Sequence, residues 1–171
     1  MTKPYIIRPE TETDKPRIAT LLARTYMDQG VQAIELVGEL RQQENYNTQL
    51  SLVADNSGEA VACAIFARVN IDNQTQNALV LASLGIDTRE IDLDVQNFLS
   101  DAMTETKKQG HRFVFMRGDL QEFSDIGFVK SRDLGLDFGK SDTGDWLVRD
   151  LSPEAGDTDI SGKVDLPSYL V

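Results

Sequence analysis

The chain of 171 residues has one cysteine, one histidine and one tryptophan, and it lacks any apolar run long enough to span a membrane. A lone Cys63 excludes an intrachain disulfide, and its place in the apolar residues 61–66 predicts a buried small hydrophobe. Without cysteine pairs or a second histidine, the sequence predicts no metal site. Residues 1–10 lack a basic segment followed by an apolar core, so we expect a cytoplasmic protein with no membrane partner.

Positive charge is also scarce. Seventeen Lys and Arg residues face twenty-eight Asp and Glu residues, which gives a formal net charge of -11, and no basic block offsets it. This charge makes nucleic acids and anionic membrane surfaces poor partners. The sequence also lacks GxSxG, GxxxxGK and HExxH motifs, and no feature of it indicates an oligomeric state.

What is present is an α/β pattern of apolar periodicities. Strands are predicted at residues 5–7, 50–54, 60–71, 78–86, 112–116, 128–138 and 145–151. Helices are predicted from Thr13 or Asp14, around residues 31–40, from about Ile91 to Gln109, and at residues 120–126. With 40% hydrophobic residues, we expect a single domain over residues 1–171, with a loop-rich tail from about residue 152.

The junction at residues 87–96 joins a buried strand to an amphipathic helix and contains no glycine. It carries four carboxylates, on Asp87, Glu90, Asp92 and Asp94. Acidic residues at a helix N-terminus stabilise the helix by about 0.3 to 1 kcal/mol each, which is the favoured interpretation. A metal site built from the same acids ranks well below it, because the sequence positions no histidine or further ligand there.

Four short motifs occur in the order found in one known family. Residues 56–59 resemble its second hairpin, and residues 83–86 resemble its "PLAV" strand. Residues 117–128 resemble its "GDP…YY.RFGF" segment, and residues 161–169 resemble its closing "SG.V.YP..F" pattern. With the order of elements, the chain resembles the GNAT-type N-acetyltransferase superfamily, in its small bacterial YhbS-like branch. This resemblance implies a mixed sheet of about six or seven strands with helices on both faces, in which residues 77–86 and 112–116 form parallel strands.

The resemblance also implies a function, which is acyl transfer from acetyl-CoA to an amine of a small molecule or a protein. The pantetheine arm would pair with the backbone at Leu84 and Ile86, where contacts do not require particular side chains. The alternative is a non-catalytic relative that binds another small molecule or a protein partner. No catalytic residue is assigned.

The chain departs from the family where the cofactor's pyrophosphate would bind. The family has a Q/R-x-x-G-x-G/A loop whose bare amides wrap the phosphates, and this chain has residues 91–96 in its place, with Asp94 and Gln96 at the glycine positions. An aspartate about 5 Å from a phosphate charge costs on the order of 3 kcal/mol at an effective dielectric near 20. We therefore expect acetyl-CoA to bind weakly or not at all.

A second departure concerns the family's tyrosine before the "GF" motif, whose hydroxyl can protonate the departing thiolate. Glu122 and Phe123 occupy the two tyrosine positions, and Phe123 has no proton to give. Glu122 is interpreted as an exposed helix-face residue, and His111 as structural or solvated. The sequence alone places none of the four tyrosines near this point: Tyr5, Tyr26, Tyr46 and Tyr169.

Overall fold

The computed structural model describes residues 4–72, 74–87, 89, 93–152 and 159–171. The chain folds into two compact units. Unit 1 comprises Met1–Phe66 and Ala82–Glu105, and unit 2 comprises Ala67–Leu81 and Thr106–Val171. Two long strands, β3 (Glu59–Ile71) and β4 (Gln74–Ile86), each contribute to both units. The expectation of a single domain stays a prediction.

Besides the last part of β4, unit 1 contains the strands β1 (Ile6–Pro9), β2 (Ser51–Asn56) and the first part of β3. Strands β1, β2 and β3 are neighbours in the sheet. They pair antiparallel, with Ile7 opposite Ala54 and Val53 opposite Cys63. The predicted hairpin turn between β2 and β3 is confirmed. Ser57 and Gly58 both have positive φ, 56° and 94°, and the Gly58 N–H donates to the Asp55 carboxylate at 2.6 Å. Two positive φ angles suit a tight turn that follows the strand twist.

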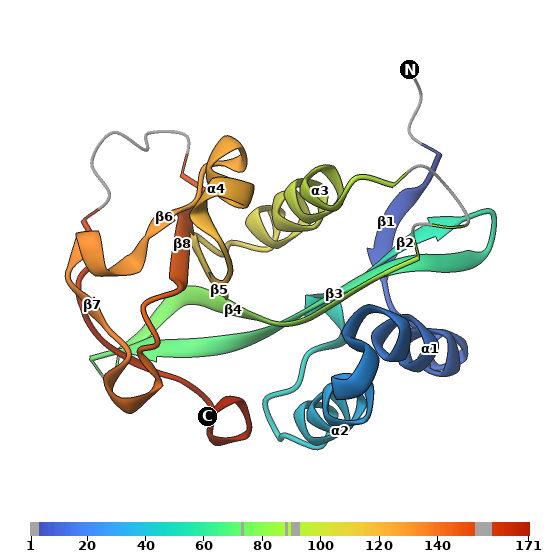
Figure 1. Cartoon of the computed structure of the whole chain (residues 1–171), viewed down its shortest axis with the longest axis horizontal. Coiled ribbons are helices and arrows are strands. Elements are labelled where there is room, and N and C mark those ends of the chain that lie inside the picture. The colour runs from blue at the N-terminus through green and yellow to red at the C-terminus, as the bar shows by residue number, and fades with distance from the viewer. Residues whose placement is uncertain (1–3, 73, 88, 90–92, 153–158) are drawn as a thin grey trace. The chain divides into compact units, whose positions relative to one another are not determined.

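The helices of unit 1 are α1 (Lys15–Tyr26), α2 (Gly30–Arg41) and most of α3 (Val95–Lys108). In α1 the apolar residues Ile18, Leu21 and Leu22 recur at helical spacing and are buried, as the sequence predicts. Figure 1 shows α1 and α2 side by side on one face of the unit 1 strands, with α3 on the opposite face. The expectation of helices on both faces is therefore confirmed.

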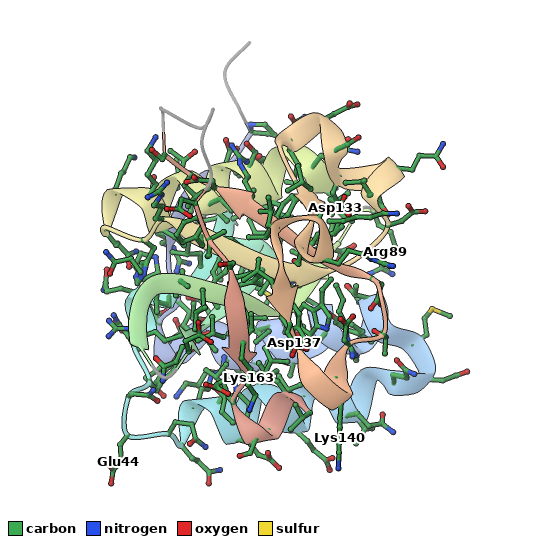
Figure 2. The ribbon with its side chains drawn as sticks, turned by 90° about the vertical axis from the view of Figure 1, so that its left-hand side faces the viewer. Glu44, Arg89, Asp133, Asp137, Lys140 and Lys163 are labelled. Atoms are coloured by element: carbon green, nitrogen blue, oxygen red, sulfur yellow. The ribbon has the colours of Figure 1, made fainter. Side chains whose placement is uncertain are left out.

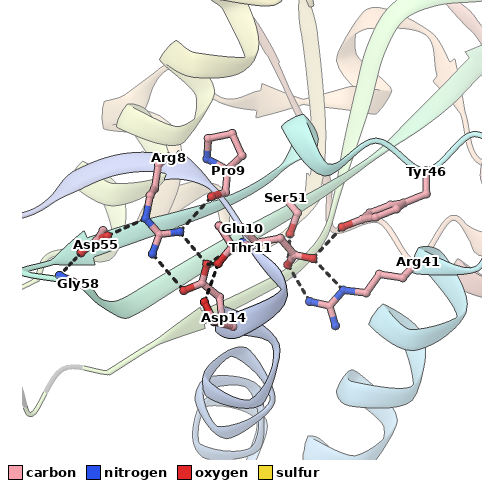
Figure 3. A network of polar contacts seen from close by, with 11 residues as sticks. Arg8, Pro9, Glu10, Thr11, Asp14, Arg41, Tyr46, Ser51, Asp55 and Gly58 are labelled. Carbon is pink, nitrogen blue, oxygen red and sulfur yellow. Dashed lines mark hydrogen bonds and ion pairs between the residues drawn. The ribbon is translucent and has the colours of Figure 1, made fainter.

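A buried polar network ties α2 to the strands of unit 1 (Figure 3). Glu10, only 6% exposed, accepts two hydrogen bonds from Arg41, at 3.0 and 2.7 Å. The hydroxyls of Tyr46 and Ser51 donate to the same carboxylate at 2.8 and 2.6 Å. A buried carboxylate is costly unless it is paired, and here Arg41, Tyr46 and Ser51 all donate hydrogen bonds to it. The network therefore fixes the end of β1 against α2 and β2.

Unit 2 contains the end of β3, the first part of β4, and the strands β5 (Phe113–Arg117), β6 (Val129–Lys130) and β8 (Trp146–Asp150). It also contains the short strands β7 (Leu136–Asp137) and β9 (Gly162–Asp165). β4 and β5 run parallel, with Ala78 opposite Phe113 and Val80 opposite Phe115. β8 pairs antiparallel with both β5 and β6. The predicted parallel pair is confirmed, and the hydrogen-bonded strand order is β1-β2-β3-β4-β5-β8-β6.

The predicted strand at residues 128–138 is wrong. It is divided into β6, a 3-10 turn at Ser131–Leu134 and β7 (Leu136–Asp137), because Gly135 adopts a left-handed φ of 75° that ends the turn. β7 pairs with an unpredicted strand, β9 (Gly162–Asp165), in which Lys163 lies opposite Asp137 (Figure 2). The described residues thus hold nine strands in place of the seven predicted.

The short helix predicted at residues 120–126 is present as α4 (Leu120–Phe123) followed by a 3-10 turn, Ser124–Ile126. Gly127 then takes a left-handed φ of 90°, and Phe128 enters the core at 2% exposure. Both features agree with a helix end followed by a buried aromatic residue. Within the described part of the chain, no helix is both long enough and apolar enough to cross a membrane.

Candidate functional site

The two residues predicted to hold a ligand by their backbone, Leu84 and Ile86, lie in the part of β4 that belongs to unit 1. The Leu84 N–H donates to the Tyr26 hydroxyl at 3.2 Å, and the Ile86 N–H donates to the Thr25 hydroxyl at 2.9 Å. Both backbone donors therefore have side-chain partners from the end of α1. Sequence reasoning missed Tyr26, because a contact between residues 58 positions apart leaves no local signal.

Gly85 explains why α1 lies so close to β4. A Cβ atom at Gly85 would lie 3.0 Å from Cys63 Sγ, 3.1 Å from Leu21 Cβ and 3.2 Å from Leu22 Cδ2. These distances are shorter than ordinary van der Waals contact, so a larger residue would move α1 away from the strand. Cys63 is buried as predicted, and burial raises the pKa of its thiol to about 12, which leaves it protonated and unreactive.

The end of α1 is a sharp corner. Met27 follows Tyr26 with φ 50° and ψ -113°, an unusual backbone conformation for a residue with a side chain. After it, α2 begins at Gly30, where an added Cβ would lie 2.8 Å from the Ala23 Cα. This close packing of the two helices holds the corner in place. It fixes the positions from which Thr25 and Tyr26 reach the strand.

Asp87, directly after Ile86, is 2% exposed and lies among three arginines. Arg24 Nη1 and Arg17 Nη2 lie 2.7 and 3.2 Å from its Oδ2, and Arg89 Nε lies 3.1 Å from its Oδ1. Hydrogen bonds from Arg89 and the charges of Arg89 and Arg24 lower the pKa of Asp87 to about 2. The interpretation of Asp87 as a residue that stabilises the following helix is therefore wrong, because its carboxylate pairs with arginines instead. Figure 2 labels Arg89, whose side chain is largely exposed.

The helix that follows the acidic junction, α3, begins at Val95. The Asn97 N–H donates to the Asp94 carboxylate at 2.9 Å, which is the N-cap contact that satisfies a free amide of a first helical turn. The interpretation of Asp94 as a helix-stabilising residue is thus confirmed. Glu90 and Asp92, named in the same prediction, lie outside the described residues, as does Ile91.

In unit 2, Phe123 is a core residue. Its ring is 6% exposed and meets Phe128 edge to face, with centroids 6.3 Å apart and an interplanar angle of 74°. Gly118 permits this packing, since an added Cβ would lie 3.1 Å from the Phe123 ring. Glu122 is exposed, as predicted. Phe123 is therefore a buried core ring without a titratable proton.

An open pocket of about 860 Å³ lies in unit 2, between α4 and the start of β8. It is lined by Gly118, Asp119, Leu120, Gln121, Ser124, Lys130, Gly144, Asp145 and Leu147. Asp119 uses its carboxylate to cap α4, accepting from the Gln121 N–H at 2.9 Å. His111 lies half-buried elsewhere in unit 2, and burial together with the Arg68 charge lowers its pKa. Among the described residues, no three His, Cys, Asp or Glu side chains are grouped to hold a metal.

No protein-family model and no curated protein matches the sequence. The arrangement of strands and helices, however, is the fold of the GNAT-family N-acetyltransferases. The chain is similar to the GNAT-family N-acetyltransferase YhbS from Escherichia coli, solved in complex with CoA. The two are 24% identical over 99% of this chain and 94% of that chain, with a TM-score of 0.79.

Two further solved structures share the fold. A GNAT-family acetyltransferase from Brucella melitensis, in complex with acetyl-CoA, is 18% identical over 98% of both chains, with a TM-score of 0.73. A chain of the NatC complex, bound to Gag peptide and CoA, is 11% identical over 88% of this chain and 100% of that chain, with a TM-score of 0.60. At these identities the likeness establishes the fold.

Proposed function

We propose that this protein binds an acyl-CoA donor, with acetyl-CoA as the model ligand, along β4 and transfers the acyl group to an amine of a small molecule or a protein. The observation that carries the proposal is the geometry of β4 at Leu84 and Ile86. Their N–H groups lie past Ala78–Val80, the β4 residues that pair with β5. Each N–H group donates to a side-chain hydroxyl, which a ligand acceptor can replace. The fold, shared with structures that contain CoA or acetyl-CoA, supports this site.

The second part of the proposal is that the affinity for acetyl-CoA is low. In this chain Asp94 uses its carboxylate to cap α3 at the place where the family's loop offers bare amides to phosphate. The same carboxylate repels an anionic ligand, and Asp92 adds a second negative charge nearby in sequence. Gln96 further replaces a glycine by a residue with a side chain. Weak phosphate binding follows from these three residues together.

Replacement of these residues tests the proposal. The triple variant Asp92→Arg, Asp94→Gly and Gln96→Gly should tighten acetyl-CoA binding at least about tenfold, or roughly 1.4 kcal/mol, in a calorimetric titration. A control with Glu35→Arg and Glu44→Gln changes the net charge by the same amount at exposed positions of unit 1 and should leave binding unchanged. Equal gains in both variants would assign the effect to net charge, and micromolar binding by the unmodified protein would contradict the low affinity.

Turnover should recover less than binding in the triple variant. The buried Phe123 ring has no proton to give to the departing thiolate, so a general acid is missing at that position. Adding Phe123→Tyr to the triple variant tests this step by itself. The rate of CoA release with an amine acceptor should rise, while the affinity for acetyl-CoA stays that of the triple variant.

A second candidate function is a non-catalytic relative that binds another small molecule or a protein. Two observations favour it, since Asp94 acts as a helix cap and Phe123 as a core residue, so both expected site positions have structural roles. Failure of the triple variant to bind either acetyl-CoA or pantetheine would select this candidate. Tighter binding by that variant would select the acyl-CoA site.

A further inference from the structure

Two hydroxyl groups of α1 occupy the edge of β4 in unit 1. Leu84 and Ile86 are two residues apart, so their N–H groups point to the same edge of the strand. The Tyr26 hydroxyl accepts from the first at 3.2 Å, and the Thr25 hydroxyl accepts from the second at 2.9 Å. The Thr25 hydroxyl also donates to the Ile86 carbonyl at 3.4 Å, so one side chain satisfies both backbone groups of that residue.

The neighbouring packing sets α1 against β4 within unit 1. Helix α1 packs so closely on Gly85 at Leu21, and on Gly30 at Ala23, that neither glycine has room for a Cβ atom. These two contacts oppose small shifts of the α1 backbone. Met27 ends α1 with a positive φ directly after Tyr26. The hydroxyls therefore leave the strand by side-chain rotation, which costs far less than moving a packed helix.

The site is also open to a ligand. Thr25 is exposed, and Tyr26, Leu84 and Ile86 are half-buried. When one acceptor replaces another on the same N–H group, the net change in hydrogen-bond free energy is small. A carbonyl oxygen from an extended chain can thus replace a hydroxyl on this edge of β4. It could not replace a neighbouring β-strand, which is held by several backbone hydrogen bonds at once.

We propose that Thr25 and Tyr26 are the residues that control ligand binding at the β4 edge: their hydroxyls occupy the Leu84 and Ile86 N–H groups until the carbonyl groups of a pantetheine arm displace them. The inference rests on the proposed function and deepens it. It selects ligands that offer carbonyl acceptors along an extended chain. It also gives a second source of low affinity, independent of the phosphate end of the ligand.

Pantetheine itself is the appropriate probe, because it lacks the pyrophosphate and is therefore insensitive to Asp92, Asp94 and Gln96. The Tyr26→Phe and Thr25→Val variants should each bind pantetheine about fivefold more tightly than the unmodified protein, as expected for removing one competing hydrogen bond. The controls are Tyr5→Phe and Thr20→Val. Tyr5 donates to Asp101 at 2.8 Å and Thr20 donates to the Pro16 carbonyl at 3.1 Å, so neither hydroxyl contacts β4.

Amide hydrogen exchange provides a readout that needs no ligand. In the free protein, Tyr26→Phe should speed exchange at Leu84 and Thr25→Val should speed it at Ile86, while the controls leave both amides unchanged. Unchanged exchange at Leu84 in a folded Tyr26→Phe variant would overturn the proposal. So would weaker pantetheine binding by that variant, because it would mean that the hydroxyl contacts the ligand.

The outcomes separate the inference from the proposed function. If the α3 triple variant tightens acetyl-CoA binding while Tyr26→Phe changes neither ligand, the inference fails and the proposed function stands. If Tyr26→Phe tightens pantetheine binding while the triple variant does not tighten acetyl-CoA binding, the inference stands and the explanation from the phosphate loop fails. If no variant binds pantetheine at all, the β4 edge is not a ligand site and the inference is overturned as well.

Discussion

Arg8 and Asp14 show how single charged residues are used inside this acidic chain (Figure 3). Arg8 donates to both Asp14 oxygens, at 2.7 and 3.0 Å, and the Thr11 N–H donates to the same carboxylate at 2.7 Å. Hydrogen bonds from Arg8 and Thr11 outweigh burial and lower the pKa of Asp14 from 3.8 to about 2. The carboxylate is thus held in its charged form where helix α1 starts.

This pKa predicts a stability that depends on acid. Because the folded pKa lies below the unfolded one, the contribution is present above about pH 4 and is lost as the pH falls toward 2. Asp14→Asn should therefore lower the free energy of unfolding by about 2 kcal/mol at pH 7, and by much less near pH 2. Urea unfolding at both pH values measures the difference. A loss that is equal at the two pH values would contradict a role of the charge.

Phe128 is the residue whose packing is most directly testable in unit 2. At 2% exposure and in contact with Phe123, its replacement by alanine should cost about 3 to 5 kcal/mol, since most of the ring's cavity would stay empty. Val129→Ala, at the next position but 45% exposed, is the matched control and should change little. Thermal unfolding compares the two. Equal melting temperatures for Phe128→Ala and Val129→Ala would show that the ring is not part of the core.

At the scale of elements, the N-cap of α3 links stability to the candidate site. Asp94 accepts from the Asn97 N–H, so Asp94→Ala should lower the free energy of unfolding by about 1 kcal/mol. Asp94→Ser keeps a side-chain acceptor without the charge, and it should recover most of that loss. Urea unfolding of the two variants tests the cap. If serine and alanine destabilise the protein equally, the contribution comes from the charge at the helix N-terminus and not from the hydrogen bond.

The sequence predicts those elements whose signal is local. Apolar spacing is sufficient for α1 and for the strands β4 and β5, whose parallel pairing is implied by the family resemblance. Residues 55–58 are sufficient for the hairpin. Prediction from the sequence fails where a strand depends on distant pairing partners. Strand β9 has a single buried residue, Val164, and is defined by its pairing with β3 and β7. The prediction of one strand over residues 128–138 fails for another reason. Gly135 can adopt a left-handed conformation as readily as an extended one.

The candidate site divides in the same way. The part of β4 around Gly85 and the stabilising role of Asp94 at the start of α3 could be predicted from the sequence, since both depend on neighbouring residues along the chain. The Tyr26 contact with Leu84 could not, because it requires α1 to lie against β4 at a distance that Gly85 permits but does not specify. Asp87 is similar. Two of its three arginines, Arg17 and Arg24, come from α1, and only the fold brings them to Asp87.

At the scale of the whole molecule, the net charge of -11 acts on every anionic ligand. Salt screens this repulsion, so acetyl-CoA should bind the unmodified protein more tightly at about 300 mM than at about 20 mM salt, the opposite of an ordinary phosphate site. Pantetheine carries no phosphate and should be unaffected, which makes it the control. Calorimetric titrations at the two salt concentrations measure both ligands. If acetyl-CoA instead binds more weakly as salt is added, basic groups dominate its contacts, and the exposed guanidinium groups of Arg24 and Arg89 beside Asp87 are the ones to replace next.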